Sequence, residues 1–151
     1  MIHVHLDCFF KRGLLEAAYV VAVVSLRQLG IEGVVEFLVD TGASRTTISD
    51  KDAIRLGIDY FKLEKLPGGT LGIGGNVDTY VAKGSEVSFK TRDKKYHVEK
   101  LDKLYVLRHE RVDDNIKRIP SVLGRDVLNK YLFVYDRRKE KAAITDERQI
   151  T

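Results

Sequence analysis

The feature that most constrains this chain is an apolar run, Val34–Val39, that ends in Asp40-Thr41-Gly42. The β-branched and bulky side chains of the run predict a buried strand. Asp40 then stands where that strand ends, and a carboxylate there is costly unless it is hydrogen-bonded or paired. Gly42 lets the backbone turn sharply and lets another segment approach closely. This arrangement suits a catalytic carboxylate, but a bare Asp-Thr-Gly can also do no more than cap a turn.

Length and charge narrow the class of protein. The 151 residues predict a single domain over residues 1–151, long enough to bury a core without disulfides. The net charge is +4, and acids and bases are interleaved along most of the chain. Such a pattern is typical of a solvated surface, so we expect no nucleic-acid partner. The densest basic run, residues 137–141, lies between two strand-like segments and predicts a hairpin turn.

Other classes are excluded by what the sequence lacks. Cys8 is the only cysteine, so no intrachain disulfide forms and a reducing compartment is favoured. The four histidines lack metal-ligand spacing, so no metal site and no cofactor are expected. The longest apolar stretch, residues 17–26, is too short to span a bilayer, and the first residues carry no signal-peptide pattern. We therefore expect no membrane partner and a cytoplasmic location.

Most of the chain is predicted to form strands. Gly30 and Gly33 are expected to bracket the turn before the strand that delivers Asp40. The polar segment 108–118 is expected to be a surface insertion. The predicted strands cover residues 2–6, 19–26, 34–39, 77–81, 86–90, 96–101 and 104–107, then an apolar strand that ends at Gly124, then 132–135 and 142–145.

Two short helices interrupt the strands. Ser49 fits a helix N-cap, Asp52 fits the first turn, and Gly57 fits the C-terminal stop. A second short helix is predicted directly after Gly124. Between them, Gly72-Ile73-Gly74-Gly75 is too glycine-rich for a core and predicts a mobile hairpin tip. It is not a phosphate cradle, because it lacks a Gly-Lys-Ser/Thr ending and a helix start.

Three motifs now stand in order along a short chain. Together they resemble the retropepsin-like aspartic proteases, the single-lobed relatives of pepsin, over about residues 19–146. The motifs are Val39-Asp40-Thr41-Gly42-Ala43-Ser44, Gly72-Ile73-Gly74-Gly75 and Ser121-Val122-Leu123-Gly124-Arg125-Asp126-Val127-Leu128.

The resemblance implies an all-β, closed-barrel lobe with one or two short helices that works as a homodimer on polypeptide substrates. It implies that Asp40 is the catalytic acid and that Thr41 hydrogen-bonds across the dimer axis, with Gly42 completing the motif. It implies that Val122-Leu123-Gly124 packs beneath the active-site loop. The substrate-binding residues that it implies are Ala43, Ser44 and the flap residues Gly72, Ile73, Gly74 and Gly75.

Counting carboxylates supports the homodimer independently. Acid proteolysis needs two carboxylates that face one water, yet the chain holds one Asp-Thr-Gly and no Asp-Ser-Gly. The second carboxylate must then be Asp40 of another copy, related by a twofold axis. Two such carboxylates share a proton and titrate as a pair, which predicts activity at acidic pH that falls towards neutrality.

Two departures separate the chain from the retroviral enzymes. Those enzymes carry an acid where Ser44 stands, which pairs with the arginine equivalent to Arg125. We therefore predict that Arg45 pairs with Asp126 instead. Residues 1–18 form an N-terminal extension, and the tail is longer than in the retroviral enzymes. The sequence therefore does not predict which surface forms the dimer. The helix near residues 49–57 and the hairpin of residues 133–145 look more like those of the cellular relatives.

Two other functions compete with this reading. Asp-Thr-Gly also resembles the phosphate loops of the actin and sugar-kinase class, but those folds need two lobes and over twice this length. The second alternative is a non-catalytic module that keeps the retropepsin fold for dimerisation or peptide binding.

Overall fold

The computed structural model describes residues 4–11, 16–68, 70–72 and 75–146. These residues are mainly β, with two short α-helices and three 3-10 turns among them. Its elements are β1 (His5–Asp7), β2 (Phe9–Phe10), β3 (Ala18–Leu26), η1 (Arg27–Leu29), β4 (Ile31–Val39), β5 (Thr47–Ile48), α1 (Asp50–Leu56), η2 (Tyr60–Lys62), β6 (Glu64–Lys65), β7 (Thr70–Gly72), β8 (Gly75–Lys90), β9 (Tyr96–His109), η3 (Ile116–Arg118), β10 (Ser121–Leu123), α2 (Arg125–Leu128), β11 (Leu132–Asp136) and β12 (Lys141–Thr145).

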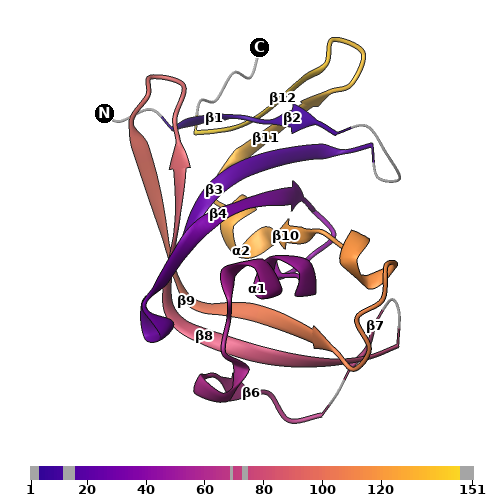
Figure 1. The fold of residues 1–151 in the computed structure, drawn as a ribbon. Helices are drawn as coiled ribbons and strands as arrows, with labels where there is room; N and C mark the ends of the chain where they lie inside the picture. The colour runs from indigo at the N-terminus through magenta and orange to yellow at the C-terminus, as the bar shows by residue number, and fades with distance from the viewer. Residues whose placement is uncertain (1–3, 12–15, 69, 73–74, 147–151) are drawn as a thin grey trace.

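Six strands close into a barrel. They follow the order β3, β4, β10, β5, β9 and β8, and β8 pairs back onto β3 through Val23↔Ser88 to Ser25↔Glu86. The ring surrounds the core, with α1 against β9 and β4 (Figure 1). This architecture confirms the predicted all-β closed barrel with short helices. The largest fully buried side chains are Phe37, Phe89, Leu6, Leu26, Ile48, Leu104, Leu123 and Ile144.

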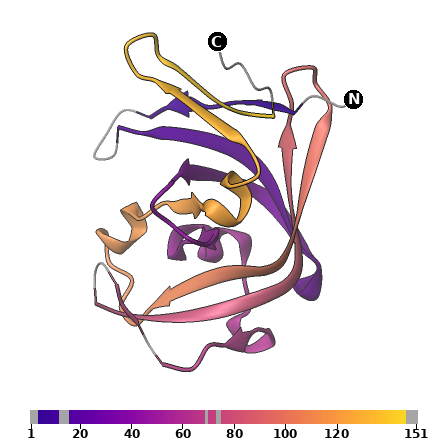
Figure 2. The same cartoon turned by 180° about the vertical axis from the view of Figure 1, so that it is seen from behind.

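A smaller sheet of three strands, in the order β1, β12 and β11, covers one end of the barrel (Figure 2). Its inner side chains Leu6 and Ile144 belong to the same hydrophobic cluster as the barrel residues. The described part of the expected N-terminal extension is therefore built into the fold, because β1 pairs with β12 and β2 pairs with β3. The hairpin of β11 and β12 forms around the basic run, as predicted.

The strand boundaries differ from the prediction in β8 and β9. Four strands were expected, yet each pair is one continuous strand, of 16 residues in β8 and 14 in β9. Their register continues from Lys83↔Lys103 to Ser85↔Leu101 on either side of Gly84, which has φ of 62°. A glycine with this conformation lets the ribbon bend without ending it. One part of β8 then pairs with β6 and β7, and the other with β3.

The expected turn between Gly30 and Gly33 is also placed differently. The connection is made by η1 and by Gly30, whose φ is 65°. Gly33 lies inside β4, opposite Val24. A Cβ atom on Gly33 would lie 2.2 Å from Cδ2 of Leu56. Any larger residue at position 33 would therefore displace the end of the Leu56 side chain, a contact between β4 and α1 that the local sequence does not reveal.

Both predicted helices are present. Ser49 precedes α1 with extended backbone angles, and Gly57 ends it with φ of 71°. The segment 108–118 is mostly exposed, but it begins within β9 and buries His109 and Ile116, and its origin as an insertion stays a prediction. Among the residues that the structure describes, no helix combines the length and apolarity that a membrane crossing requires.

Candidate active site

Asp40 lies directly after β4, at the point where that strand meets β10. The two strands are parallel, with Leu123 beside Val39. The backbone N–H of Asp40 donates to the carbonyl of Leu123 at 3.1 Å. The apolar run thus carries Asp40 from the core to a half-buried position at the barrel end, as the sequence predicted.

The tripeptide folds back on its own carboxylate. The N–H of Gly42 donates to Oδ1 of Asp40 at 2.9 Å, and the N–H of Ala43 donates to the carbonyl of Asp40 at 3.2 Å. A Cβ atom on Gly42 would lie 3.1 Å from the same Oδ1, which is tighter than ordinary contact. Within the described part of the chain, the other carboxylate oxygen of Asp40 accepts no hydrogen bond. One oxygen is therefore fixed and the other is open.

The segment after β10 holds this loop from beneath. Gly124 packs so closely that an added Cβ would lie 2.5 Å from the carbonyl carbon of Arg45. The backbone N–H of Arg125 donates to the carbonyl of Ala43 at 2.8 Å. The Arg125 guanidinium donates to the carbonyl of Thr41 at 2.9 Å. These contacts confirm that the Val122-Leu123-Gly124 stretch underlies the loop.

Asp126 fixes the far end of the loop through Thr46. Its Oδ2 accepts from the backbone N–H of Thr46 at 2.9 Å, and its Oδ1 accepts from the Thr46 hydroxyl at 2.6 Å. The Thr46 hydroxyl oxygen in turn accepts the N–H of Gly124 at 3.1 Å. Thr46 is completely buried, so these bonds form away from water.

The predicted ion pair between Arg45 and Asp126 is wrong. Both Asp126 oxygens are already occupied by Thr46. The Arg45 guanidinium lies instead over the Tyr105 ring, 4.5 Å from its centroid. A cation over an aromatic face is stabilised by the ring quadrupole without a carboxylate partner. Sequence spacing alone does not distinguish these two partners.

The glycine-rich segment forms the predicted hairpin up to its tip. Strands β7 and β8 pair from Thr70↔Val77 to Gly72↔Gly75. Ile73 and Gly74, which were predicted to complete the flap, lie outside the described residues. Thr41 and Ser44 are exposed, and Ala43 is half-buried. The catalytic and substrate-binding roles of these residues stay predictions.

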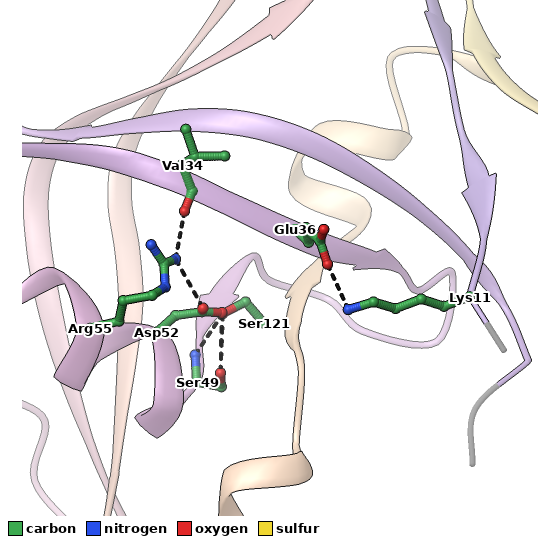
Figure 3. Close-up of polar contacts among 7 residues, drawn as sticks. All are labelled: Lys11, Val34, Glu36, Ser49, Asp52, Arg55 and Ser121. Carbon is green, nitrogen blue, oxygen red and sulfur yellow. Dashed lines mark hydrogen bonds and ion pairs between the residues drawn. The ribbon is translucent and has the colours of Figure 1, made fainter. Parts of the chain in front are cut away.

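A buried network that sequence reasoning missed connects α1 to β10 and β4 (Figure 3). Asp52 accepts from the Ser121 hydroxyl at 2.6 Å and from Arg55 at 3.1 Å, and the Ser49 hydroxyl lies 3.4 Å away. Arg55 also donates to the carbonyl of Val34. The spacing of Ser49 and Asp52 is a capping-box pattern, which was the available signal. The structure uses it differently, because Ser49 makes no side-chain cap bond.

Two further buried acids are fully paired. Asp50 accepts from Nδ1 of His109 at 2.6 Å and from its backbone N–H at 2.8 Å. Glu99 accepts from Lys130 at 2.9 Å and also contacts Tyr131 and His97. Burial raises the pKa of Glu99, but the bonds from Tyr131, His97 and Lys130 outweigh it and hold that pKa below its ordinary value. Apart from the one between His97 and Glu99, these contacts join residues far apart in the sequence, so no local pattern predicts them.

The described residues contain no cluster of three or more histidine, cysteine or acidic side chains that could hold a metal ion. The loop offers a carboxylate with one open oxygen, held between a barrel strand and a tight turn.

Comparison with known proteins gives two kinds of likeness. A family model described as aspartyl protease matches residues 24–127. The crystal structure of a retropepsin-like aspartic protease from Rickettsia conorii aligns with 95% of this chain and 93% of its own, at 21% identity and a TM-score of 0.57. The EIAV protease complexed with the inhibitor HBY-793 aligns with 79% of this chain and 91% of its own, at 21% identity and a TM-score of 0.43. No curated protein sequence matches significantly.

Proposed function

The chain belongs to the aspartyl protease family, and from this premise we propose that it is an endopeptidase that acts as a homodimer. Two Asp40 carboxylates, one from each copy, hold and activate the water that attacks the peptide bond. The single observation that most supports this proposal is the state of the Asp40 carboxylate. Its Oδ1 is fixed by the Gly42 N–H at 2.9 Å, while its other oxygen accepts no bond within the described chain.

The need for a second copy follows from the number of acids. The chain contains one Asp-Thr-Gly, and the acids near the loop are already occupied. Asp126 serves Thr46 and Asp50 serves His109, so neither is available as the partner carboxylate. A twofold axis beside the loop supplies the missing acid as Asp40 of the other copy. Thr41 is exposed there and can hydrogen-bond across that axis.

The mechanism follows from electrostatics. Two carboxylates a few Å apart share one proton and titrate as a pair. The ionised member accepts a proton from the water while the protonated member donates a hydrogen bond to the scissile carbonyl. Water attacks directly, and no covalent intermediate forms. The hairpin at Gly72 and Gly75 closes over the substrate and excludes bulk water, and Ala43 and Ser44 contact the substrate backbone.

The test is digestion of casein over about pH 3 to 7, with and without pepstatin, by the wild type and by Asp40→Asn. We expect pepstatin-sensitive cleavage that is strongest at acidic pH and absent in Asp40→Asn. The molecular mass in solution is measured in parallel and should be that of two chains. Cleavage by Asp40→Asn, or by a strict monomer, would disprove the proposal. A folded dimer that cleaves nothing would support the alternative, a non-catalytic dimerisation or peptide-binding module.

A further inference from the structure

The positive charge of the chain is concentrated in two hairpin turns. The turns, residues 90–95 between β8 and β9 and residues 136–141 between β11 and β12, carry eight Lys and Arg against three acids. Their net charge of +5 exceeds the +4 of the whole chain, so the remaining residues together carry −1. The interleaving of charges that the sequence suggests therefore does not hold at these turns.

Both turns lie at the same end of the molecule, on either side of the three-stranded sheet (Figures 1 and 2). Between them is a concave surface with a volume of about 630 Å³, which we name the basic groove. Arg92 comes from one turn and Lys141 from the other. Leu132 and Val134 line the same surface, and each is 41% exposed. Asp7 and Glu140 line it as well, so the walls carry both charges. The basic groove thus has an aliphatic floor, and its positive field comes from the two turns that flank it.

Most of the cations at the two turns form no ion pair within the described part of the chain. Arg92 pairs with Asp7 at 2.7 Å, and Arg137 pairs with Glu140 at 3.1 Å. The remaining six are exposed and form no ion pair with any residue that the structure describes: Lys90, Lys94, Lys95, Arg138, Lys139 and Lys141. Their combined field attracts anions over about one Debye length, roughly 10 Å at ordinary salt.

We propose that the basic groove binds an extended acidic segment of polypeptide with aliphatic side chains at alternate positions, and that it recruits such substrates to the protease. The recruiting role rests on the proposed function, whereas the binding itself does not. Leu132 and Val134 are two residues apart on β11, so both point to one face, and every second side chain of an extended peptide can meet them. In the described part of the sheet, β11 pairs with β12 alone and its other edge is open to an added strand.

The same observations disfavour other occupants. A single-stranded nucleic acid binds through aromatic rings that stack on its bases, and no Phe, Tyr or Trp is among the described residues that line the groove. A bilayer would need apolar side chains at the protruding turns, but the turns are polar and the aliphatic side chains are recessed between them. A second copy of this chain would bring a second net charge of +5 to the first, which is repulsive.

Binding is measured on the full chain with Asp40→Asn, so that no probe is cleaved. The probe is a fluorescein-labelled peptide of about 12 residues that alternates Glu and Leu, which spans about 40 Å when extended. Three competitors of other chemistry are run beside it: the same peptide with Lys in place of Glu, a thymine oligonucleotide of equal charge, and vesicles of phosphatidylserine and phosphatidylcholine. We expect the acidic peptide to bind best and its affinity to fall as salt rises from about 0.05 to about 0.5 M.

Three double variants locate the binding. Lys95→Glu with Lys139→Glu changes one cation at each turn and should weaken binding about tenfold. Lys62→Glu with Lys117→Glu makes the same charge change at exposed positions outside the groove that form no ion pair with a described residue, and should have little effect. Leu132→Ser with Val134→Ser leaves the charge unchanged and should weaken binding about fivefold through lost apolar contact.

Several results would overturn the proposal. One is an equal loss of peptide affinity in the control variant Lys62→Glu, Lys117→Glu. Another is no loss of affinity in Leu132→Ser, Val134→Ser. A third is tighter binding of the oligonucleotide or the vesicles than of the acidic peptide. Failure here is separable from failure of the proposed function, which is tested by cleavage of a neutral peptide in the presence and absence of pepstatin. In an active enzyme, the Lys95→Glu, Lys139→Glu pair should raise KM for acidic substrates and leave cleavage of the neutral peptide unchanged.

Discussion

Asp40 and Asp50 are both acids that directly follow an extended segment, yet their surroundings differ. Asp50 is buried, and both of its oxygens accept bonds from His109, at 2.6 and 2.8 Å. Asp40 is half-buried, and one oxygen accepts one bond from the Gly42 N–H. Asp52, Asp126 and Glu99 follow the pattern of Asp50, because each has both oxygens engaged.

The comparison indicates which acid is able to do chemistry. A buried carboxylate whose oxygens are all satisfied stabilises the fold, and losing its donors or its charge is costly. A carboxylate that keeps one oxygen open can accept a bond from water or from a second carboxyl group. The difference is not readable from residue type, since the sequence contains 22 acids. It depends on which donors the fold brings to each one.

The largest expected effect separates these two acids directly. Asp40→Asn should reduce peptidase activity at least about 10³-fold and change the free energy of unfolding by less than about 0.5 kcal/mol. Asp50→Ala should do the reverse, because it leaves the buried N–H groups of His109 without that acceptor. We expect it to cost about 3 kcal/mol of unfolding free energy while the folded fraction keeps its activity. Urea unfolding and single-turnover cleavage measure the two quantities.

The comparison would break if the two variants behaved alike. A large loss of stability in Asp40→Asn would mean that its open oxygen has a structural partner after all. A loss of activity in fully folded Asp50→Ala would place that acid in the chemistry. Asp50→Asn is the matched control, since it keeps one acceptor for His109 and should lie between Asp50→Ala and the wild type in stability.

The next effect concerns how the open carboxylate is held. Gly124→Ala would place a methyl group 2.5 Å from the carbonyl carbon of Arg45, so the active-site loop must move. Such overpacking costs about 1–3 kcal/mol, and we expect activity to fall further than stability because the loop carries Asp40. Gly84→Ala is a useful control, since its cost comes from φ of 62° and nothing lies within 4 Å of the added Cβ. It should lower stability and leave kcat unchanged.

Sequence patterns predicted much of this fold and site for identifiable reasons. The apolar run before Asp40, the glycine that ends α1 and the β11–β12 hairpin are local signals, and the structure confirms them. The placement of the stretch before Gly124 beneath the loop came instead from the family resemblance, and the contacts of Gly124 with Arg45 agree with it.

The errors share a different cause, which is dependence on distant partners. From the sequence alone, Gly84 predicts a turn between two strands. In the structure the pairing with β9 continues on both sides of it, so β8 bends there without ending. Gly33 resembles a turn residue unless Leu56 is seen against it. The ion pair between Arg45 and Asp126 was predicted because the true partner of each is distant from it in sequence. Arg45 lies over Tyr105, and Asp126 accepts from Thr46. Contacts of this kind need the three-dimensional arrangement.

Glu99 sharpens the comparison through pH. Since its pKa in the folded protein is held below the ordinary value of 4.5, its ionised form stabilises the fold above that pH, and the contribution is lost as pH falls through the lowered pKa. Glu99→Gln should therefore cost about 2 kcal/mol near neutrality, with the deficit shrinking as pH falls below 4.5. Unfolding free energies of both proteins across this range test it. A deficit independent of pH would mean that Glu99 acts by packing alone.

The smallest expected effect concerns the two serine hydroxyls near Asp52. It tests whether the hydroxyl at the shorter distance contributes more to stability. Ser49 occupies an N-cap position, where loss of the hydroxyl typically costs about 1 kcal/mol. Here that hydroxyl makes no cap bond and lies 3.4 Å from Asp52, whereas the Ser121 hydroxyl lies 2.6 Å from the same carboxylate and also accepts the N–H of Ser49 at 2.9 Å. Ser49→Ala should therefore cost less than about 0.5 kcal/mol, and Ser121→Ala about 1.5 kcal/mol. If urea unfolding showed a larger loss for Ser49→Ala than for Ser121→Ala, Ser49 would act as an ordinary N-cap. The hydrogen bond from Ser121 would then not be the main stabilising contact of Asp52.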